Sequence, residues 1–110
     1  MDRRVGLRTR TDFQVLAQRG SLRSLYRGID VSPTGIVIDR GRPITELDWP
    51  LWQRLELQLP EYLKPVRALA RPIWSRESTQ AFKFVRIADV DRLILAEHVD
   101  FMSVRGDVLH

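Results

Sequence analysis

The sequence contains no cysteine, so a disulfide framework and a thiolate metal site are both excluded. It also lacks any apolar run approaching the roughly twenty residues that a membrane-spanning helix requires. The first ten residues, MDRRVGLRTR, are strongly charged, and no apolar stretch of signal-peptide type follows them. We therefore expect a cytoplasmic protein without a membrane span. Its 110 residues are enough for one domain with a modest core.

Residues that usually carry enzyme chemistry are scarce. The chain has two histidines, His98 and His110, and neither belongs to an H-x-x-x-H motif or a carboxylate cluster with metal-ligand spacing. No G-x-S-x-G nucleophile motif and no P-loop occurs. We expect His98 to lie on a helix surface. We also expect that the protein is not an enzyme and holds no cofactor or metal.

Positive charge is in excess, and nearly all of it comes from arginine. The net charge is +4, and sixteen of the eighteen basic residues are arginine. A guanidinium offers a planar fork of donors that fits phosphate or the O6/N7 edge of guanine, although GC-rich codon usage is the simpler explanation of composition alone. Residues 1–12 form a basic arm, an element that is usually solvated and only sometimes grips a ligand. Its arginines are Arg3, Arg4, Arg8 and Arg10.

Alternating polar and apolar residues predict a mainly β fold. Residues 54–59 are the clearest case, because Leu55, Leu57 and Leu59 alternate with polar residues without a fault. Pro72 indicates an edge strand or a bulge in a later run. Brief connections favour a six-stranded antiparallel barrel or sandwich. The strands are expected at residues 13–17, 22–29, 36–39, 54–59, 66–74 and 81–87, with a loop over 40–50.

A change of period near residue 88 predicts a C-terminal α-helix. From Ala88 to about Met102 the apolar residues form a wide sector that has to be buried, so we expect the helix to plug the sheet or to pack against one side of it, with Asp89 available as N-cap. The sector comprises Val90, Leu93, Ile94, Ala96, Val99 and Phe101. We therefore divide the chain into the basic arm 1–12, a barrel with its helix over 13–104, and a tail over 105–110.

The turn between the second and third expected strands is more polar than its geometry requires. It reads DVSPTG, and Pro33 and Gly35 alone would satisfy a turn. Asp30 and Ser32 occupy alternate positions, which point the same way on an extended backbone. Taken by themselves, these two residues are best explained as caps of local backbone N–H groups.

Two short motifs taken together give a more specific indication. The segment RVGLR has the form RxxxR, and DVSPTG has the form DxSxxG about twenty residues later. In this order and spacing they resemble the PilZ domain, a bacterial receptor module for cyclic di-GMP. The similarity covers nearly the whole chain, because LELQLP resembles the family's central strand, ALARPIWS and AFKFV the strands that follow, and DVDRLILAEHV the C-terminal helix.

The resemblance implies a PilZ-type barrel with a C-terminal helix and a ligand site shared by the arm and the turn. Arg4 and Arg8 would grip guanine edges and phosphate, which their fork geometry suits. Asp30 would accept hydrogen bonds from guanine N1–H and N2–H₂, and Ser32 would offer a hydroxyl near the base or phosphate. Gly35 would leave room for the ligand against the backbone.

Three further residues are candidates by their chemistry. Arg3 immediately precedes the RxxxR motif, and its flat guanidinium could stack on a purine or bridge a second phosphate. Arg10 adds to the charge of the arm. Trp74 could serve as a stacking platform, although for at least two of the three tryptophans, with Trp49 and Trp52, a core or loop-anchor role is the simpler expectation. The arm has enough charge for two stacked cyclic di-GMP molecules per chain.

The expected function is that of a non-enzymatic sensor whose arm folds over cyclic di-GMP and thereby reshapes a surface for an effector protein. Two alternatives stay open. The first is a ligand-independent adaptor that uses the PilZ fold for protein contact only, although such an adaptor has no reason to keep both motifs. The second is a small basic barrel for single-stranded nucleic acid, which steep salt dependence and length-dependent affinity for oligonucleotides would identify.

Overall fold

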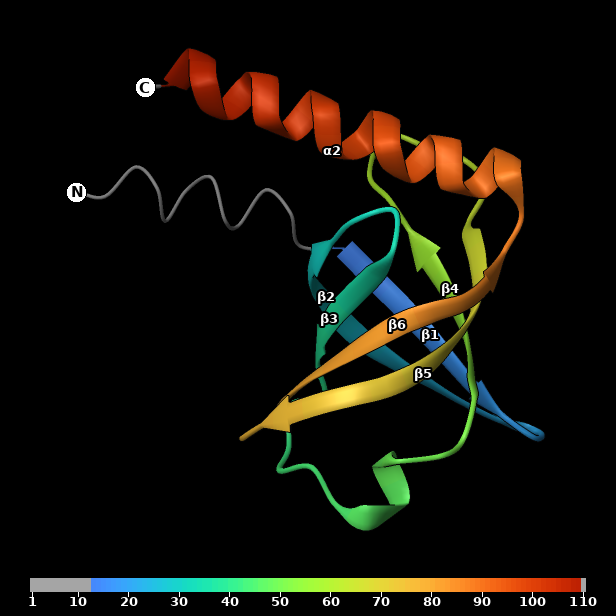
Figure 1. Cartoon of the computed structure of the whole chain (residues 1–110). Helices are drawn as coiled ribbons and strands as arrows, with labels where there is room; N and C mark the ends of the chain where they lie inside the picture. Colours follow the sequence, from blue (N-terminus) through green and yellow to red (C-terminus); the bar gives the residue numbers. More distant parts are fainter. Residues whose placement is uncertain (1–12, 110) are drawn as a thin grey trace.

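A computed structural model describes residues 13–109, with side chains described through residue 102. Six antiparallel strands close into a barrel in the order β1-β2-β3-β6-β5-β4, as Figure 1 shows. The mainly β class and the single C-terminal helix predicted from the sequence are confirmed. The elements are β1 (Phe13–Arg19), β2 (Leu22–Val31), β3 (Gly35–Asp39), the 3-10 helix η1 (Glu46–Asp48), β4 (Gln53–Gln58), β5 (Val66–Arg76), β6 (Thr79–Ile87) and the α-helix α2 (Asp89–Leu109).

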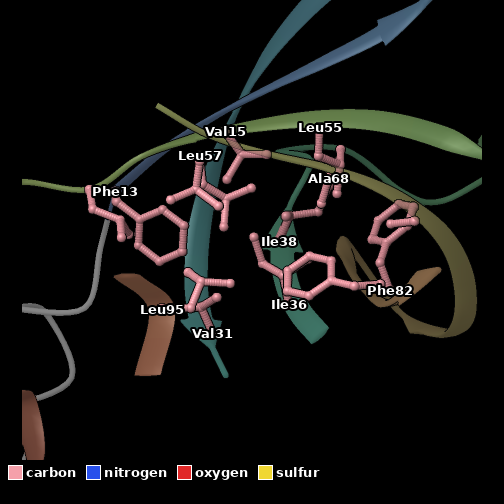
Figure 2. Packing of buried hydrophobic residues seen from close by; sticks show 14 of the residues in the cluster. Phe13, Val15, Val31, Ile36, Ile38, Leu55, Leu57, Ala68, Phe82 and Leu95 are labelled. Carbon is pink, nitrogen blue, oxygen red and sulfur yellow. The ribbon is translucent and has the colours of Figure 1, made fainter. Parts of the chain in front are cut away.

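Apolar side chains that point inward from every strand fill the barrel. Val15, Ile38 and Leu57 are completely buried, and Figure 2 shows side chains from different strands meeting in one cluster. Each buried Val, Leu, Ile or Phe stabilises the fold by about 1.5–3 kcal/mol relative to an exposed one. The strict alternation of these residues fixes the register, because a slip by one position would turn every inward side chain to water.

Pro72 lies beside a break in the ladder between β5 and β6. Pro72 is opposite Phe82, and the register shifts before Trp74 pairs with Ala81. The bulge expected at this proline is therefore confirmed. Further shifts lie between Leu69 and Ala70 in the same ladder and between Gly28 and Asp30 in the pairing of β2 with β3. Bulges of this kind bend and twist strands, which helps a six-stranded sheet to close.

Helix α2 differs from the expectation in its cap, its length and its buried face. Ala88 accepts the first helical hydrogen bond, from the N–H of Arg92 at 2.9 Å, so Ala88 and not Asp89 occupies the cap position. The helix continues to Leu109 and does not end near residue 102. Leu95 is the apolar helical residue that becomes fully buried, whereas the expected core residues Val90, Leu93 and Phe101 are exposed.

The position of α2 explains why Val90, Leu93 and Phe101 are exposed. Figure 1 shows the helix lying across one end of the barrel and not along the face of the sheet. A helix that crosses a narrow opening is covered along one stripe only, and Leu95 and His98 are the buried residues of that stripe. No helix within residues 13–109 is both long enough and apolar enough to cross a membrane.

The two ends of the barrel are built differently, and we name them for their main features. The arm end is where β1 begins, and it carries the turn at residues 32–34, the connection 59–65 and α2. The loop end is where β1 stops, and it carries residues 40–52 with η1 and the short turns at 20–21 and 77–78. Figure 1 places the long loop at the opposite end of the barrel from α2.

Candidate functional site

The turn that follows β2 is held by the hydroxyl of Ser32. The Ser32 Oγ accepts hydrogen bonds from the backbone N–H groups of Thr34 and Gly35, both at 3.2 Å. It also lies 3.1 Å from the hydroxyl of Thr34. Ser32 therefore caps the turn, as its residue type alone suggests. Its own hydroxyl hydrogen can still be directed to Thr34 or to a ligand.

Asp30 is not a cap of this kind. Its side chain is exposed near the end of β2, and it forms no hydrogen bond or ion pair with any described residue. Within the described part of the chain, the polar turn thus contains one hydroxyl that serves the fold and one carboxylate that serves no visible structural purpose. An unpaired, accessible carboxylate can accept hydrogen bonds from donors outside the chain.

Gly35 has a structural reason to be glycine. A Cβ atom at this position would lie 2.5 Å from the backbone oxygen of Phe82 in β6, a distance that would force the strands apart. Gly35 therefore permits the close approach of β3 to β6 at the root of the turn. The space required for packing is sufficient to explain this glycine, whether or not a ligand lies beside it.

Strand pairing extends the surface beside the turn across four strands. Asp30 pairs with Val37, Val37 with Ala81, and Ala81 with Trp74, so these residues form a row across β2, β3, β6 and β5. Because β2 and β5 are three positions apart in the closed six-stranded barrel, this row runs half-way round the barrel, and Trp74 lies on the opposite side from Asp30. Beside Asp30 the row continues with the half-buried Val37 and with Ala81, which is only 4 % exposed.

A second row on the same face carries uncompensated positive charge. Gly35 pairs with Lys83, and Lys83 pairs with Arg71. Lys83 and Arg71 are exposed, and neither forms an ion pair with a described residue. Like charges directly opposite one another destabilise a sheet, so this pair is unfavourable for the fold alone. Neither residue could be assigned to the site from the sequence, because only the observed register places them beside Gly35.

The start of β1 connects the basic arm to this surface. Phe13 pairs with Gly28, two positions before Asp30 in β2. A Cβ atom on Gly28 would lie 2.3 Å from the Phe13 ring, so glycine is required there for the ring to pack. The arm residues Arg3, Arg4, Arg8 and Arg10 lie outside the described residues. Their expected ligand contacts therefore stay predictions.

His98 was expected on the helix surface, and this expectation is wrong. Its side chain is only 2 % exposed, and its Nδ1 lies 2.8 Å from Oε1 of Glu61 in the connection between β4 and β5. Its ring packs edge-on against the ring of Phe13, with 6.5 Å between the centroids. The buried histidine thus joins α2 both to the connection 59–65 and to the residue at which the arm enters the barrel.

A second hydrogen bond attaches α2 to the same connection. The hydroxyl of Tyr62 donates to Oε1 of Glu97 at 2.5 Å. This bond to a carboxylate, together with burial, raises the pKa of Tyr62 to about 12. The phenol therefore stays protonated at neutral pH and remains a donor. Two bonds from adjacent residues, Glu61 and Tyr62, hold the helix over the arm end.

At the loop end, the buried polar groups form hydrogen bonds with one another. The carboxylate of Asp48 is buried. It accepts hydrogen bonds from both terminal nitrogens of Arg42 at 2.7 Å and from the backbone N–H of Thr45 at 2.8 Å. The Arg42 bonds, with smaller effects of Thr45 and Arg40, hold the pKa of Asp48 well below its usual range despite burial. Gln80, inside the barrel, donates to the Asp48 carbonyl and accepts from Arg40, both at 2.7 Å.

The three tryptophans are not core residues. Trp49, Trp52 and Trp74 are 43, 57 and 46 % exposed, so the expected core role is wrong, while the expected role as loop anchors stays a prediction. Trp74 lies across the barrel from Asp30, so the strand order does not bring it beside the polar turn. Trp49 and Trp52 lie at the loop end and are not brought near Asp30 by the strand pairing.

The surface around Asp30 is an open face. Two surface hollows of about 530 and 570 Å³ lie elsewhere, and neither is lined by Asp30, Ser32 or Lys83. Within the described residues, no group of three or more His, Cys, Asp or Glu side chains could hold a metal ion. Chemically, the face can accept hydrogen bonds at Asp30 and attract anions at Lys83 and Arg71.

Comparison with known proteins establishes the fold and leaves the activity open. No protein-family model and no curated protein matches the chain. The crystal structure of an uncharacterized Legionella protein is similar, with a TM-score of 0.56 and 13 % identity over 84 % of this chain and 89 % of that one. At this level of identity, the similarity shows a shared fold.

Proposed function

We propose that the protein is a PilZ-type receptor that binds cyclic di-GMP on the open face beside Asp30 and signals to a partner protein without itself being an enzyme. The observation that carries the proposal is the Asp30 carboxylate, which is exposed and unpartnered among the described residues. Guanine presents N1–H and N2–H₂ on one edge, and a carboxylate can accept both. The RxxxR motif in the arm supplies the complementary donor groups.

The cationic row supports the same ligand. Lys83 and Arg71 lie next to Gly35 on the outer face, within one and two strand spacings of the turn. A ligand with two phosphodiesters would neutralise two cations that otherwise repel one another. This gives the unfavourable pair a use that folding does not provide. Trp74 lies across the closed barrel from Asp30, so the proposed site does not include it.

The arm is long enough to reach this face. Arg8 precedes Phe13 by five residues, and an extended chain spans at most about 3.3–3.6 Å per residue, or roughly 18 Å in total. Phe13 itself pairs with Gly28 beside the start of the polar turn. Arg4 and Arg8 can therefore act as the second wall of a site whose first wall is the open face of the barrel.

Contacts of Phe13 and His98 supply a route from the ligand to α2. Phe13 joins the arm to β1, and its ring packs against His98 in the helix. A ligand that holds the arm against the barrel favours those conformations of Phe13 that are compatible with the bound arm. Because His98 is also bound to Glu61, a shift of Phe13 would alter how α2 sits on the connection 59–65. The partner would then read the position of α2.

Calorimetry with cyclic di-GMP tests the proposal, with cyclic di-AMP and GTP as control ligands. Arg4→Ala, Arg8→Ala and Asp30→Ala should each weaken binding by about 1–3 kcal/mol, or roughly ten- to a hundredfold. Arg76→Ala is the matched control, because it removes an exposed arginine at the loop end. Absence of binding by the unmodified protein would leave the ligand-independent adaptor as the better explanation.

Stoichiometry is a separate question in the same titration. Two stacked molecules per chain are expected, and Arg3→Leu should shift this number towards one, since leucine can neither stack on a purine by cation–π attraction nor bridge a second phosphate. A one-to-one complex of the unmodified protein would refute the stacked pair while leaving the receptor function intact. Length-dependent, strongly salt-sensitive binding of oligonucleotides would instead favour the nucleic-acid barrel.

A further inference from the structure

Four large apolar side chains are exposed within six consecutive residues at the loop end. We call these residues the apolar tip. Large apolar side chains scattered singly over a surface are normal, but a cluster on one short segment indicates an interaction site. The members are Leu47 at 71 %, Trp49 at 43 %, Leu51 at 78 % and Trp52 at 57 % exposure.

The segment that carries the apolar tip is held firmly in place. Asp48, in the middle of it, is buried and bound by both terminal nitrogens of Arg42. Thr45 and Asp48 form a reciprocal capping box at the start of η1. Gln80 from inside the barrel donates to the Asp48 carbonyl, and Arg19 donates to the carbonyl of Leu47. The backbone is thus fixed by polar contacts while the apolar side chains point to water.

Charge around the apolar tip is mainly positive. Arg19 ends β1, Arg23 lies near the start of β2, and Arg54 lies near the start of β4, so all three are at the loop end. None of them is paired with a carboxylate among the described residues. Of the carboxylates at the loop end, Asp48 is buried and bound and Asp39 is paired with Arg27, which leaves Glu46 and Glu77 exposed.

We propose that the apolar tip inserts into the headgroup region of an anionic lipid bilayer, with the three arginines held against lipid phosphates. Tryptophan and leucine favour the boundary between headgroups and acyl chains, and arginine keeps its charged end at the polar level. A bilayer surface of negative potential complements the basic rim. A second copy of this chain fits less well, because each copy would bring the same arginines to the interface.

The position of the apolar tip is compatible with such docking. Figure 1 shows the loop projecting from the barrel at the opposite end from α2, so the tip can meet a flat surface without the helix intervening. The open face with Asp30 belongs to strands that run between the two ends and stays accessible. The inference is independent of the proposed ligand, since no residue of the tip belongs to the row from Asp30 to Trp74.

Sedimentation with vesicles tests the inference. We expect the full chain to bind vesicles of phosphatidylglycerol mixed with phosphatidylcholine, and to bind pure phosphatidylcholine vesicles at least tenfold more weakly. Leu51→Glu should lower binding to the anionic vesicles by at least about tenfold, because an inserted leucine is replaced by a charge. Leu51 is largely exposed, so this change should leave the fold intact.

Leu63→Glu is the matched control, because Leu63 is 100 % exposed and lies in the connection at the arm end. It should bind the anionic vesicles like the unmodified protein. Equal binding to both vesicle types, binding to neither, or equal losses in the two leucine variants would overturn the inference. A dimer in lipid-free solution that Leu51→Glu converts to monomer, without vesicle binding, would overturn it in favour of a second copy of the chain.

Discussion

Two aspartates at opposite ends of the barrel have opposite surroundings. Asp48 at the loop end is buried, accepts three short hydrogen bonds and has a lowered pKa. Asp30, towards the arm end, is exposed and has no partner among the described residues. The same carboxylate therefore serves the fold in one place and is free to meet a ligand in the other. Residue type alone does not distinguish the two roles, but the environment does.

Cations show the same contrast. Arg40 at the loop end is buried, donates to Gln80 and lies over the ring of Tyr26, 4.7 Å from its centroid. Arg71 is exposed and sits opposite Lys83, another cation. Folding gains from the first arrangement and loses from the second. Groups that the fold uses are poor candidates for recognition, and groups that the fold tolerates at a cost are better ones.

The largest expected effect comes from removing the carboxylate that the fold uses. Asp48→Ala leaves the buried Arg40 without a counter-charge and frees Arg42, so the free energy of unfolding should fall by about 3–5 kcal/mol. Asp30→Ala should change it by less than about 0.5 kcal/mol, because an exposed, unpartnered side chain is lost. Urea denaturation of both variants measures the difference. Equal losses would break the comparison.

Acid titration sharpens this prediction. The pKa of Asp48 is lower in the folded protein than in the unfolded chain, so its contribution to stability is fully present above the unfolded value, about pH 4. The contribution is lost as the pH falls through the folded value. Stability of the unmodified protein should therefore drop more steeply below pH 4 than stability of Asp48→Ala. Parallel curves for the two proteins would contradict the assigned role.

Gly35→Ala should have an intermediate effect. The added Cβ meets the Phe82 oxygen at 2.5 Å, and we expect a loss of about 1–3 kcal/mol in the free energy of unfolding from overpacking. If the glycine serves packing, cyclic di-GMP affinity per folded molecule should change little. A large loss of affinity at unchanged stability would show instead that this glycine makes room for the ligand. Denaturation and calorimetry on the same preparation separate these results.

The smallest expected effect concerns the cationic row. Arg71→Ala removes a like-charge pair and should raise the free energy of unfolding by about 0.2–1 kcal/mol in the absence of ligand. The same change should lower affinity for cyclic di-GMP severalfold, because a phosphate partner is lost. Opposite signs for stability and binding are characteristic of a residue kept for recognition. A loss of both would indicate that Arg71 supports the fold.

Much of the fold could be predicted from the sequence because alternation is a local property. The run from Arg54 to Leu59 carries its own register signal, and Pro72 marks its own bulge. The face of α2 could not be predicted in this way. The sequence shows which helical residues are apolar, but it does not show how much of the helix surface the barrel covers. A helix across the barrel end buries only one stripe of its residues. His98 was misplaced for the same reason, since its partner Glu61 is 37 positions away.

The candidate site divides in the same way. The polar turn is a local motif, so Asp30, Ser32 and Gly35 could be named from the sequence. Lys83 and Arg71 could not, because their position beside Gly35 depends on the pairing of β3 with β6 and of β6 with β5. The sequence did indicate that Lys83 points outward, because it lies between two apolar phenylalanines that are both buried. Long-range register was the missing information.

The contrast between the two ends is tested most directly by a titration with cyclic di-GMP in which the NMR chemical shifts of the backbone amides are monitored. The account predicts that the largest changes fall on arm residues 3–10, on residues 28–37 and 81–83 and on Arg71, while amides of residues 42–52 at the loop end keep their positions. Absence of any shift, or the largest shifts within residues 42–52, would contradict it.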